Sequence, residues 1–444
     1  MKKNYVTLCF AASLPFVAAT AFAQTQAAPK PAAEDAYTLK VPTAPASQVS
    51  GTPYEIKGTS ISGATAETTA PILTAPTGDA APYKTESGVY LYPTLFVGMG
   101  YNDNLQSAAT NKVSSSLVNV SPQLIAEMKN KGDRYTALVS LNKVNYADSS
   151  PDNSSNSEFK IAGDNYFSAR ARAAWALGQV RSTDPRGSNN RPISAEPDRW
   201  TSNNVDARFI YGAPEAMGRF ELDLGSTNKT YDNNRAFTSV ADVAVGSFAT
   251  RAFYRLGTRS LALAEFRNAK ANYASALSNE SNTEKRYYVG LTWDATAATS
   301  GIFKLGRMTK DFDAAGRTGF EGASWEGTLR WTPLTYSAVD LLTSRATSDS
   351  SGFGNYNLVT TNNLSWNHKW TGSLSTRAAL GVVKTEFGGT TRSDSATNYT
   401  LTMDYSVLRW LKVGVDWAGT DNTSNVPTSE FKRNVTMFTL NASL

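Results

Sequence analysis

The sequence has 444 residues, with one cysteine, one histidine and a formal net charge of +5. This mild basic balance lacks the concentrated charge of a nucleic-acid-binding protein, so no nucleic-acid partner is expected. Beyond the N-terminal segment, no stretch approaches the roughly 18 consecutive apolar residues of a membrane-spanning helix. The mean hydropathy of -0.34 does not exclude a transmembrane β-barrel, because only alternate residues of each strand then face lipid.

The first 86 residues predict two segments that precede the folded domain. Residues 1–23 have the charged start, the apolar run and the small residues up to Ala23 that mark a secretory signal peptide. Cys9 lies inside this apolar run, so the mature chain is expected to form no disulfide and no thiolate metal site. Residues 24–86 are rich in Ala, Pro, Thr and Ser and have little periodicity, which predicts a disordered segment in the periplasm.

Residues 324–345 show the pattern that most of the remaining chain repeats. Apolar and polar residues alternate with the period of two expected of a β-strand. Trp325 and Trp331 bracket the apolar face, at positions where aromatic rings would meet the two membrane interfaces, while Glu326 and Arg330 belong to the opposite face. A soluble β-sandwich with one solvated face gives the same alternation, so this hairpin alone leaves both folds open.

The series of strands and the loop lengths favour the membrane barrel. Alternating windows recur from Val89 onward, and their connections alternate between short turns and long polar loops. Bacterial barrels have short periplasmic turns, long outer loops and an even number of strands. Roughly 17 windows are visible, which is an odd number. Another strand is therefore expected within residues 158–181, followed by an external loop over 182–198. We predict an all-β fold, a transmembrane antiparallel β-barrel of about 18 strands over residues 87–444, with 16 strands as the alternative.

Five short motifs occur in order along these strands: YNDN at 101–104, DPRG at 184–187, GAP at 212–214, WNHKW at 366–370 and FKRN at 431–434. Over residues 88–444 the chain resembles the outer-membrane β-barrel porin family associated with exopolysaccharide and capsule biosynthesis. The C-terminus resembles the assembly signal of Gram-negative barrels, although Leu444 stands where the last residue is usually aromatic. The resemblance implies a Gram-negative outer-membrane protein that takes part in polysaccharide export, with outer-membrane lipid, the polymer and periplasmic export components as partners.

If the apolar faces contact lipid, the opposite faces line the lumen and carry many arginines. Arginine rings in a wide barrel concentrate anions and pair with carboxylates, which points to an anionic polysaccharide as a partner. Acidic residues share this parity, so the alternative is that the charges pair across strands and only solvate the wall. The candidate lumen and substrate-contact residues are Arg170, Arg172, Arg208, Arg219, Arg251, Arg255, Arg286, Arg330 and Arg377.

No catalytic or metal site is expected. His368 lies between Trp366 and Trp370 near a turn, which is typical of an aromatic girdle rather than of a general base beside a nucleophile. No His, Cys or carboxylate cluster has the spacing of metal ligands, so neither a metal nor another cofactor is expected and the protein is not expected to be an enzyme. Two functions remain. One is a porin-like barrel for export or secretion of an anionic exopolysaccharide, and the other is a structural or adhesive barrel without a transport role.

Overall fold

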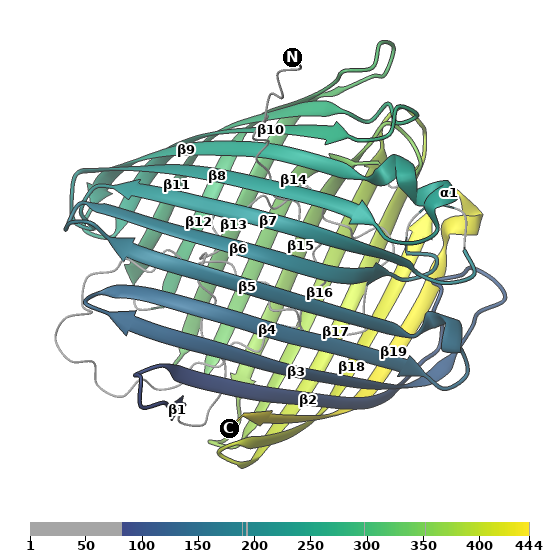
Figure 1. Ribbon diagram of the computed structural model, residues 1–444, viewed down its shortest axis with the longest axis horizontal. Helices are drawn as coiled ribbons and strands as arrows, with labels where there is room; N and C mark the ends of the chain where they lie inside the picture. The colour runs from purple at the N-terminus through teal and green to yellow at the C-terminus, as the bar shows by residue number, and fades with distance from the viewer. Residues whose placement is uncertain (1–81, 189, 192–193, 297, 351, 444) are drawn as a thin grey trace, which may run out of the picture.

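The computed structural model describes residues 82–443, apart from 189, 192, 193, 297 and 351, and shows a closed antiparallel β-barrel (Figure 1). Within this part of the chain no helix is long and apolar enough to cross a membrane. Three 3-10 turns, η1 (Ser150–Asp152), η2 (Ser239–Ala241) and η3 (Pro427–Ser429), and the short helix α1 (Arg235–Thr238) lie between strands. The strands are β1 (Tyr83–Lys84), β2 (Tyr90–Asn102), β3 (Ser115–Asn130), β4 (Asp133–Tyr146), β5 (Ser154–Tyr166), β6 (Ala171–Asp184), β7 (Asp198–Tyr211), β8 (Gly218–Tyr231), β9 (Val243–Gly257), β10 (Ser260–Tyr273), β11 (Asn282–Thr296), β12 (Thr299–Phe312), β13 (Phe320–Leu334), β14 (Ser337–Asp349), β15 (Tyr356–Lys369), β16 (Leu374–Phe387), β17 (Ser393–Leu408), β18 (Leu411–Ser424) and β19 (Phe431–Ser443).

The wall of the barrel consists of the 18 strands β2 to β19, so the predicted strand number is confirmed. Each strand pairs with the next, and β19 closes the ring by pairing with β2 from Val435–Asn102 to Ser443–Thr94. The strand expected within residues 158–181 is present, because β5 and β6 divide this region between them. The predicted signal peptide and most of the predicted periplasmic segment lie outside the described residues. Where the description begins, β1 pairs with the start of β2.

The two ends of the barrel carry connections of different length. At one end tight turns join the strands, as at residues 131–132 between β3 and β4 and residues 409–410 between β17 and β18. At the other end the connections include residues 103–114, 185–197 and 232–242. In Figure 1 the helix α1 marks the long-loop end on the right, and β1 lies toward the short-turn end. The alternation of loop length expected from the sequence is therefore present in the fold.

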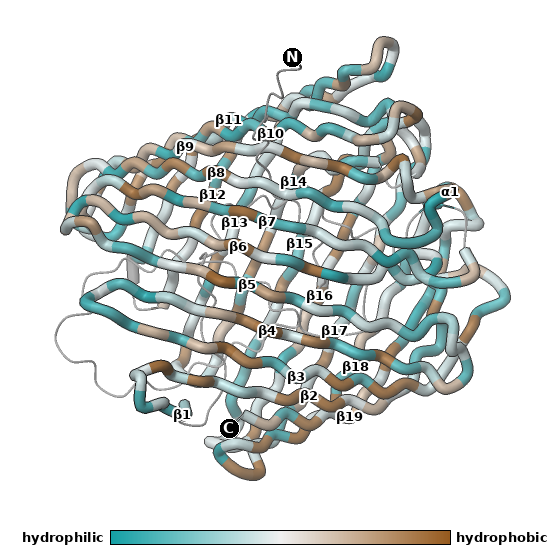
Figure 2. The backbone as a smooth tube through the Cα atoms, in the orientation of Figure 1, coloured by the Kyte–Doolittle hydropathy of each residue, from teal (hydrophilic) through white to brown (hydrophobic). Residues whose placement is uncertain are grey.

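Side chains alternate between an exposed apolar face and a buried, mainly polar face. On β11, Tyr287, Val289 and Leu291 are exposed, whereas Arg286 and Tyr288 are buried. Figure 2 shows the same alternation of hydrophobic and hydrophilic residues along single strands. In a closed barrel, side chains on the outer surface are more accessible than those that fill the interior. The exposed apolar face therefore points outward, and the buried face lines the lumen.

The lumen face is not polar everywhere. Phe253, Leu261 and Leu263 are buried on the inner parity of β9 and β10 and pack with Ile302 from β12. The sequence of β10 therefore has large apolar residues on the same parity as its charged residues. This explains why the alternation of this strand is difficult to see in the sequence.

The outer end of β14 bends into the lumen. Ala346, Thr347 and Ser348 are all buried, which a straight strand with alternating faces does not allow. The ladder between β13 and β14 stops at Trp325–Arg345, so β14 leaves β13 there while it stays paired with β15. Beyond this point Asp349 accepts hydrogen bonds from side chains of β10, β11 and β12, with the Tyr273 hydroxyl at 2.7 Å. The hairpin tip therefore narrows the lumen at the long-loop end.

The loop lengths predict the orientation of the barrel. With Cys9 replaced by serine, single cysteines at Lys112 and Leu277 in long loops should react with an impermeant maleimide on intact cells, because long loops face outward. Cysteines at Thr258 and Thr335 in short turns should react only after the outer membrane is permeabilised. Labelling of the short-turn cysteines alone on intact cells would show the opposite orientation.

Candidate functional site

Six of the nine candidate arginines form ion pairs with carboxylates on the inner face. Their partners come mostly from the same or neighbouring strands, so each positive charge is compensated locally. This arrangement agrees with the alternative interpretation, in which the charges of the wall pair with one another. The pairs are Arg172–Asp164, Arg208–Asp223, Arg219–Glu221, Arg251 with Glu221, Asp223 and Glu265, Arg286 with Glu284 and Glu326, and Arg330–Asp340.

The pairs between β8 and β13 join into one buried network. Glu265 on β10 lies 3.0 Å from Arg251, 2.5 Å from Arg267 and 3.1 Å from Lys304. Glu326 on β13 lies 2.7 Å from Arg267 and 2.5 Å from Lys304. Two carboxylates are thus shared among cations from β9, β10 and β12, and charge-assisted hydrogen bonds of this kind are the strong ones. We call this set, with Glu221, Asp223 and Arg286, the charged network.

The sequence did not single out three central members of the charged network, Glu265, Arg267 and Lys304. The neighbouring Leu261 and Leu263 share the parity of Glu265 and Arg267, which hides the polar face of β10. A usable signal was nevertheless present. Glu265 and Arg267 have the same parity, and so do Lys304 and Lys310, which made both windows candidates for an inward-facing charged row.

The three remaining candidate arginines, Arg170, Arg255 and Arg377, lie in different surroundings. Arg170 is exposed in the turn before β6, because that strand begins only at Ala171, so it does not line the wall. Arg255 donates from Nη1 to the Thr258 carbonyl at 3.1 Å and from Nη2 to a second turn carbonyl, which places its guanidinium at the short-turn rim. Arg377 lies on the inner face of β16, opposite Thr402 of β17.

Another stretch of the lumen wall, from β15 through β19 to β4, is lined by hydroxyl and amide side chains as well as by a few apolar ones. These side chains are buried on the inner parity, and neutral hydrogen-bonding groups outnumber charges among them. Such groups both donate and accept hydrogen bonds, as a polyhydroxylated solute requires. They are Thr361, Ser365, Thr385, Thr402, Thr420, Asn422, Thr439, Asn119, Ser140 and Asn142.

The long loop between β6 and β7 crosses the mouth of the barrel. Arg392, between β16 and β17, donates from Nη1 to the Asn190 side-chain oxygen at 2.9 Å. β7 and β16 are nine strands apart in the ring of 18, so this contact joins opposite walls. Gly352, between β14 and β15, has φ +102°, and a Cβ there would lie 3.2 Å from Arg191 Cγ. Loops from both walls therefore meet over the lumen.

A second group of contacts ties neighbouring loops together at the mouth. Arg317 donates to the Asn355 carbonyl at 2.7 Å and lies 3.3 Å from the Glu280 carboxylate, so it links three loops. Burial and the nearby charge of Asp349 outweigh Arg317 and raise the pKa of Glu280 to about 7. This carboxyl, which lies in the loop between β10 and β11, therefore changes its charge near neutral pH.

His368 packs among aromatic rings at the short-turn end of the barrel. Its ring centroid lies 4.4 Å from Trp370, 5.1 Å from Trp366 and 5.4 Å from Tyr336. No serine or carboxylate is seen to hydrogen-bond to it in the part of the chain that the structure describes. Among the same residues, no group of three or more His, Cys, Asp or Glu side chains is placed to hold a metal ion.

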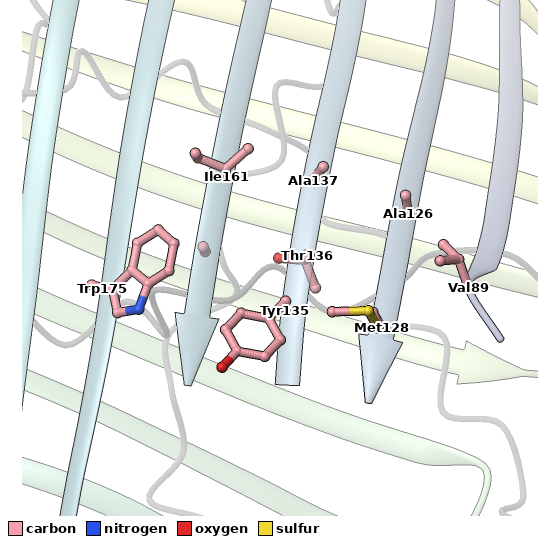
Figure 3. Close-up of a pocket in the computed structure, with 9 residues that line it drawn as sticks. Val89, Ala126, Met128, Tyr135, Thr136, Ala137, Ile161 and Trp175 are labelled. Atoms are coloured by element: carbon pink, nitrogen blue, oxygen red, sulfur yellow. The ribbon is translucent and has the colours of Figure 1, made fainter. Parts of the chain in front are cut away.

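A hollow of about 250 Å³ lies against β3 to β6 near the short-turn end (Figure 3). Met128, Tyr135 and Trp175 project along it, and Met128 belongs to the exposed apolar parity of its strand. Its lining is mostly apolar and offers few convergent polar groups. It is part of the lipid-facing surface rather than a site for a polar substrate.

The comparisons with known proteins agree with this architecture. A family model described as Putative beta-barrel porin 2 matches residues 86–444. The chain belongs to this porin family. It is therefore a porin-like outer-membrane barrel. A comparison with curated proteins found no match.

Several solved barrels are similar in structure to this porin-like chain, with low sequence identity. A bacterial polysaccharide outer membrane secretin is 7% identical, with a TM-score of 0.36, over 80% of this chain and 98% of that one. Pseudomonas aeruginosa OccK2 (OpdF), solved with glucuronate, is 11% identical, with a TM-score of 0.47, over 82% and 100%. Acinetobacter baumannii OccAB3 is 8% identical, with a TM-score of 0.47, over 81% and 99%.

Removing one cation from the charged network should destabilise the barrel. Arg251→Met removes the cation that the buried Glu221, Asp223 and Glu265 share, and loss of one partner of a buried ion pair costs about 3–5 kcal/mol. The measurement is the midpoint of thermal unfolding, followed by heat-modifiable mobility on gels. Arg307→Met is the matched control, because the exposed Arg307–Glu321 pair contributes no more than about 1 kcal/mol. Equal midpoints for the two variants would contradict the importance of the charged network.

The raised pKa of Glu280 predicts a pH-dependent mouth. A carboxyl with a raised pKa stabilises the folded loop fully at low pH, and this contribution is lost as the pH rises through about 7. Amides of residues 274–281 should therefore exchange faster, relative to the unfolded-chain rate, at about pH 8 than at about pH 5. Glu280→Gln should remove this difference, whereas Glu196→Gln in the loop between β6 and β7 should not. A difference that persists in Glu280→Gln would show that another group is responsible.

Proposed function

We propose that this porin-like barrel takes part in the export of an exopolysaccharide, which passes along the hydroxyl and amide side chains of the lumen wall from β15 through β19 to β4. One observation carries the proposal. The charged groups of the opposite wall are already paired with one another, while the neutral wall offers donors and acceptors along the lumen. A polymer rich in hydroxyl groups can exchange hydrogen bonds with such a wall without displacing ion pairs.

The proposal includes an anionic polymer, but it gives the arginines a smaller role than the sequence did. Acidic groups on the polymer would compete with carboxylates such as Asp164 and Asp340, which already hold Arg172 and Arg330. Because the opposite charges lie within a few ångströms of each other, their fields largely cancel beyond the wall. Recognition in this proposal therefore rests on hydroxyl groups first and on charge second.

The same proposal assigns the short turns and residues 24–81 to the periplasm, where export components would reach them. The support is that β1 leads into β2 at the short-turn end of the barrel, which in bacterial barrels is the periplasmic end. Residues 1–23 would be removed as a signal peptide before assembly.

A structural or adhesive barrel is the second candidate, and one specific observation favours it. The loops that meet over the mouth, through Arg392–Asn190 and Gly352–Arg191, form a surface at the long-loop end. In this alternative the barrel displays these loops and conducts nothing.

Planar-bilayer recordings together with a deletion strain distinguish the two candidates. If the barrel is an export passage, the purified protein should form stable channels with weak selectivity between anions and cations, because the wall charges are paired. Cells that lack the protein should carry less surface polysaccharide, and the wild-type chain should restore it. Absence of conductance together with unchanged surface polysaccharide would contradict export and support the structural or adhesive function.

A further inference from the structure

A small set of oxygen atoms converges on the lumen side of Gly414. In the register of the sheet, Gly414 on β18 lies between Asp404 on β17 and Thr439 on β19. A Cβ built on Gly414 would lie 2.6 Å from Asp404 Oδ1 and 2.8 Å from Thr439 Oγ1. Both oxygens therefore lean over the glycine toward one point, where any other residue would place its side chain. Asp416 lies two residues farther along β18, on the same face.

These three side chains are buried, and one oxygen of each lacks a hydrogen-bond partner, although the Asp416 carboxylate has a hydrogen bond with Thr402. Asp404 is 8% exposed, Asp416 is 7% exposed and Thr439 is 4% exposed. Within the part of the chain that the structure describes, Oδ1 of each aspartate and Oγ1 of Thr439 have no partner. Equally buried carboxylates of the charged network, such as Glu265 and Glu326, are each bound by several cations. Buried polar groups are nearly always satisfied, so the contrast indicates a place for a ligand or for water that a ligand displaces.

The charged groups around these oxygens indicate which class of ligand the oxygens would bind. Lys412 has the parity of Gly414, and Arg377 lies opposite Thr402 on the same inner face as Asp404. Lys412 lies close enough to act on the charge of Asp404, whereas the carboxylate that acts on Arg377 is Asp340. Two carboxylates beside one lysine supply fewer anionic oxygen ligands than a divalent cation prefers, and no group of three or more His, Cys, Asp or Glu side chains among the described residues is placed to hold a metal ion. Carboxylate oxygens that accept, beside a hydroxyl that can donate, instead suit the neighbouring hydroxyl groups of a sugar ring.

We propose that Asp404, Asp416 and Thr439 form a subsite for one sugar unit of a hydroxyl-rich saccharide, with Gly414 leaving the room that the sugar hydroxyls occupy. The inference rests on the proposed function and deepens it by naming where the polymer is held. Asp404 and Asp416 lie near the ends of β17 and β18 that meet at the short turn of residues 409–410. A saccharide that enters from the short-turn end therefore meets the subsite in the first part of the lumen.

Binding of maltohexaose to the detergent-solubilised full-length barrel tests the subsite by saturation-transfer NMR and calorimetry. The double variant Asp404→Asn with Asp416→Asn keeps the shape but weakens the acceptors, and it should lower the affinity at least about tenfold. Gly414→Ala should also lower the affinity, because the new methyl group displaces Asp404 Oδ1. Heat-modifiable mobility on gels verifies that each variant is folded.

Two matched controls sharpen the test. Gly381→Ala on β16 adds a methyl group whose nearest neighbour is 3.7 Å away, and Asp206→Asn changes a lumen carboxylate on β7 in the opposite half of the ring. Both should bind maltohexaose as the wild type does. Equal loss in the controls, or unchanged affinity in the subsite variants, would overturn the subsite.

The remaining outcomes are equally decisive. Failure of the wild-type barrel to bind maltohexaose overturns the subsite, and calcium binding that depends on Asp404 instead of saccharide binding overturns it in favour of a cation site. Surface polysaccharide in the deletion strain decides the proposed function separately. If that amount is unchanged while Asp404 and Asp416 still govern maltohexaose binding, the subsite stands and export is wrong.

Discussion

Closure of the sheet between β19 and β2 is the constraint on which the rest of the structure depends. A bilayer offers no water to unpaired backbone N–H and C=O groups, so a sheet can span it only without free edges. The seam pairs residues 94–102 with residues 435–443, and the Asn104 side chain extends it by donating to the Lys432 carbonyl at 3.0 Å. Once the ring is closed, every strand must send one face to lipid and the other into a limited interior.

The interior face explains the charged network. Arginines and lysines on adjacent strands would repel one another in a space with little water, and each buried charge carries a desolvation cost. Glu265 and Glu326 separate the cations and offset these costs by attraction, because each lies among several of them. The resulting ion pairs link side chains of β8 to β13 across the inner face. The charges of the network are mainly paired with one another. A high content of arginine in a lumen therefore does not by itself indicate a path for anions.

The lumen wall thus contains two stretches of different chemistry. The charges of β8 to β13 are paired with one another, whereas the stretch from β15 through β19 to β4 is mainly neutral and includes the unsatisfied oxygens around Gly414. Hydrogen-bonding groups without partners are the ones that a solute can use. The inward bend at the end of β14 and the crossing loops at the mouth restrict the long-loop end. Selection among solutes along the lumen therefore depends on the neutral stretch of the wall and on the positions of these loops.

The sequence by itself determined the barrel, its 18 strands and the ends at which long and short connections lie, because lipid and lumen impose a period of two on every strand. It also gave the correct parity for Arg251, Arg286 and Arg330. It could not show which carboxylates hold Arg251 and Arg286, since Glu221, Glu265 and Glu326 reach them only through the register of the sheet. Only the tertiary structure decided three features: the inward direction of Leu261 and Leu263, the bend of β14, and the contact of Asn190 with Arg392. Each depends on packing between segments that are distant in the chain or on a ring that must already be closed.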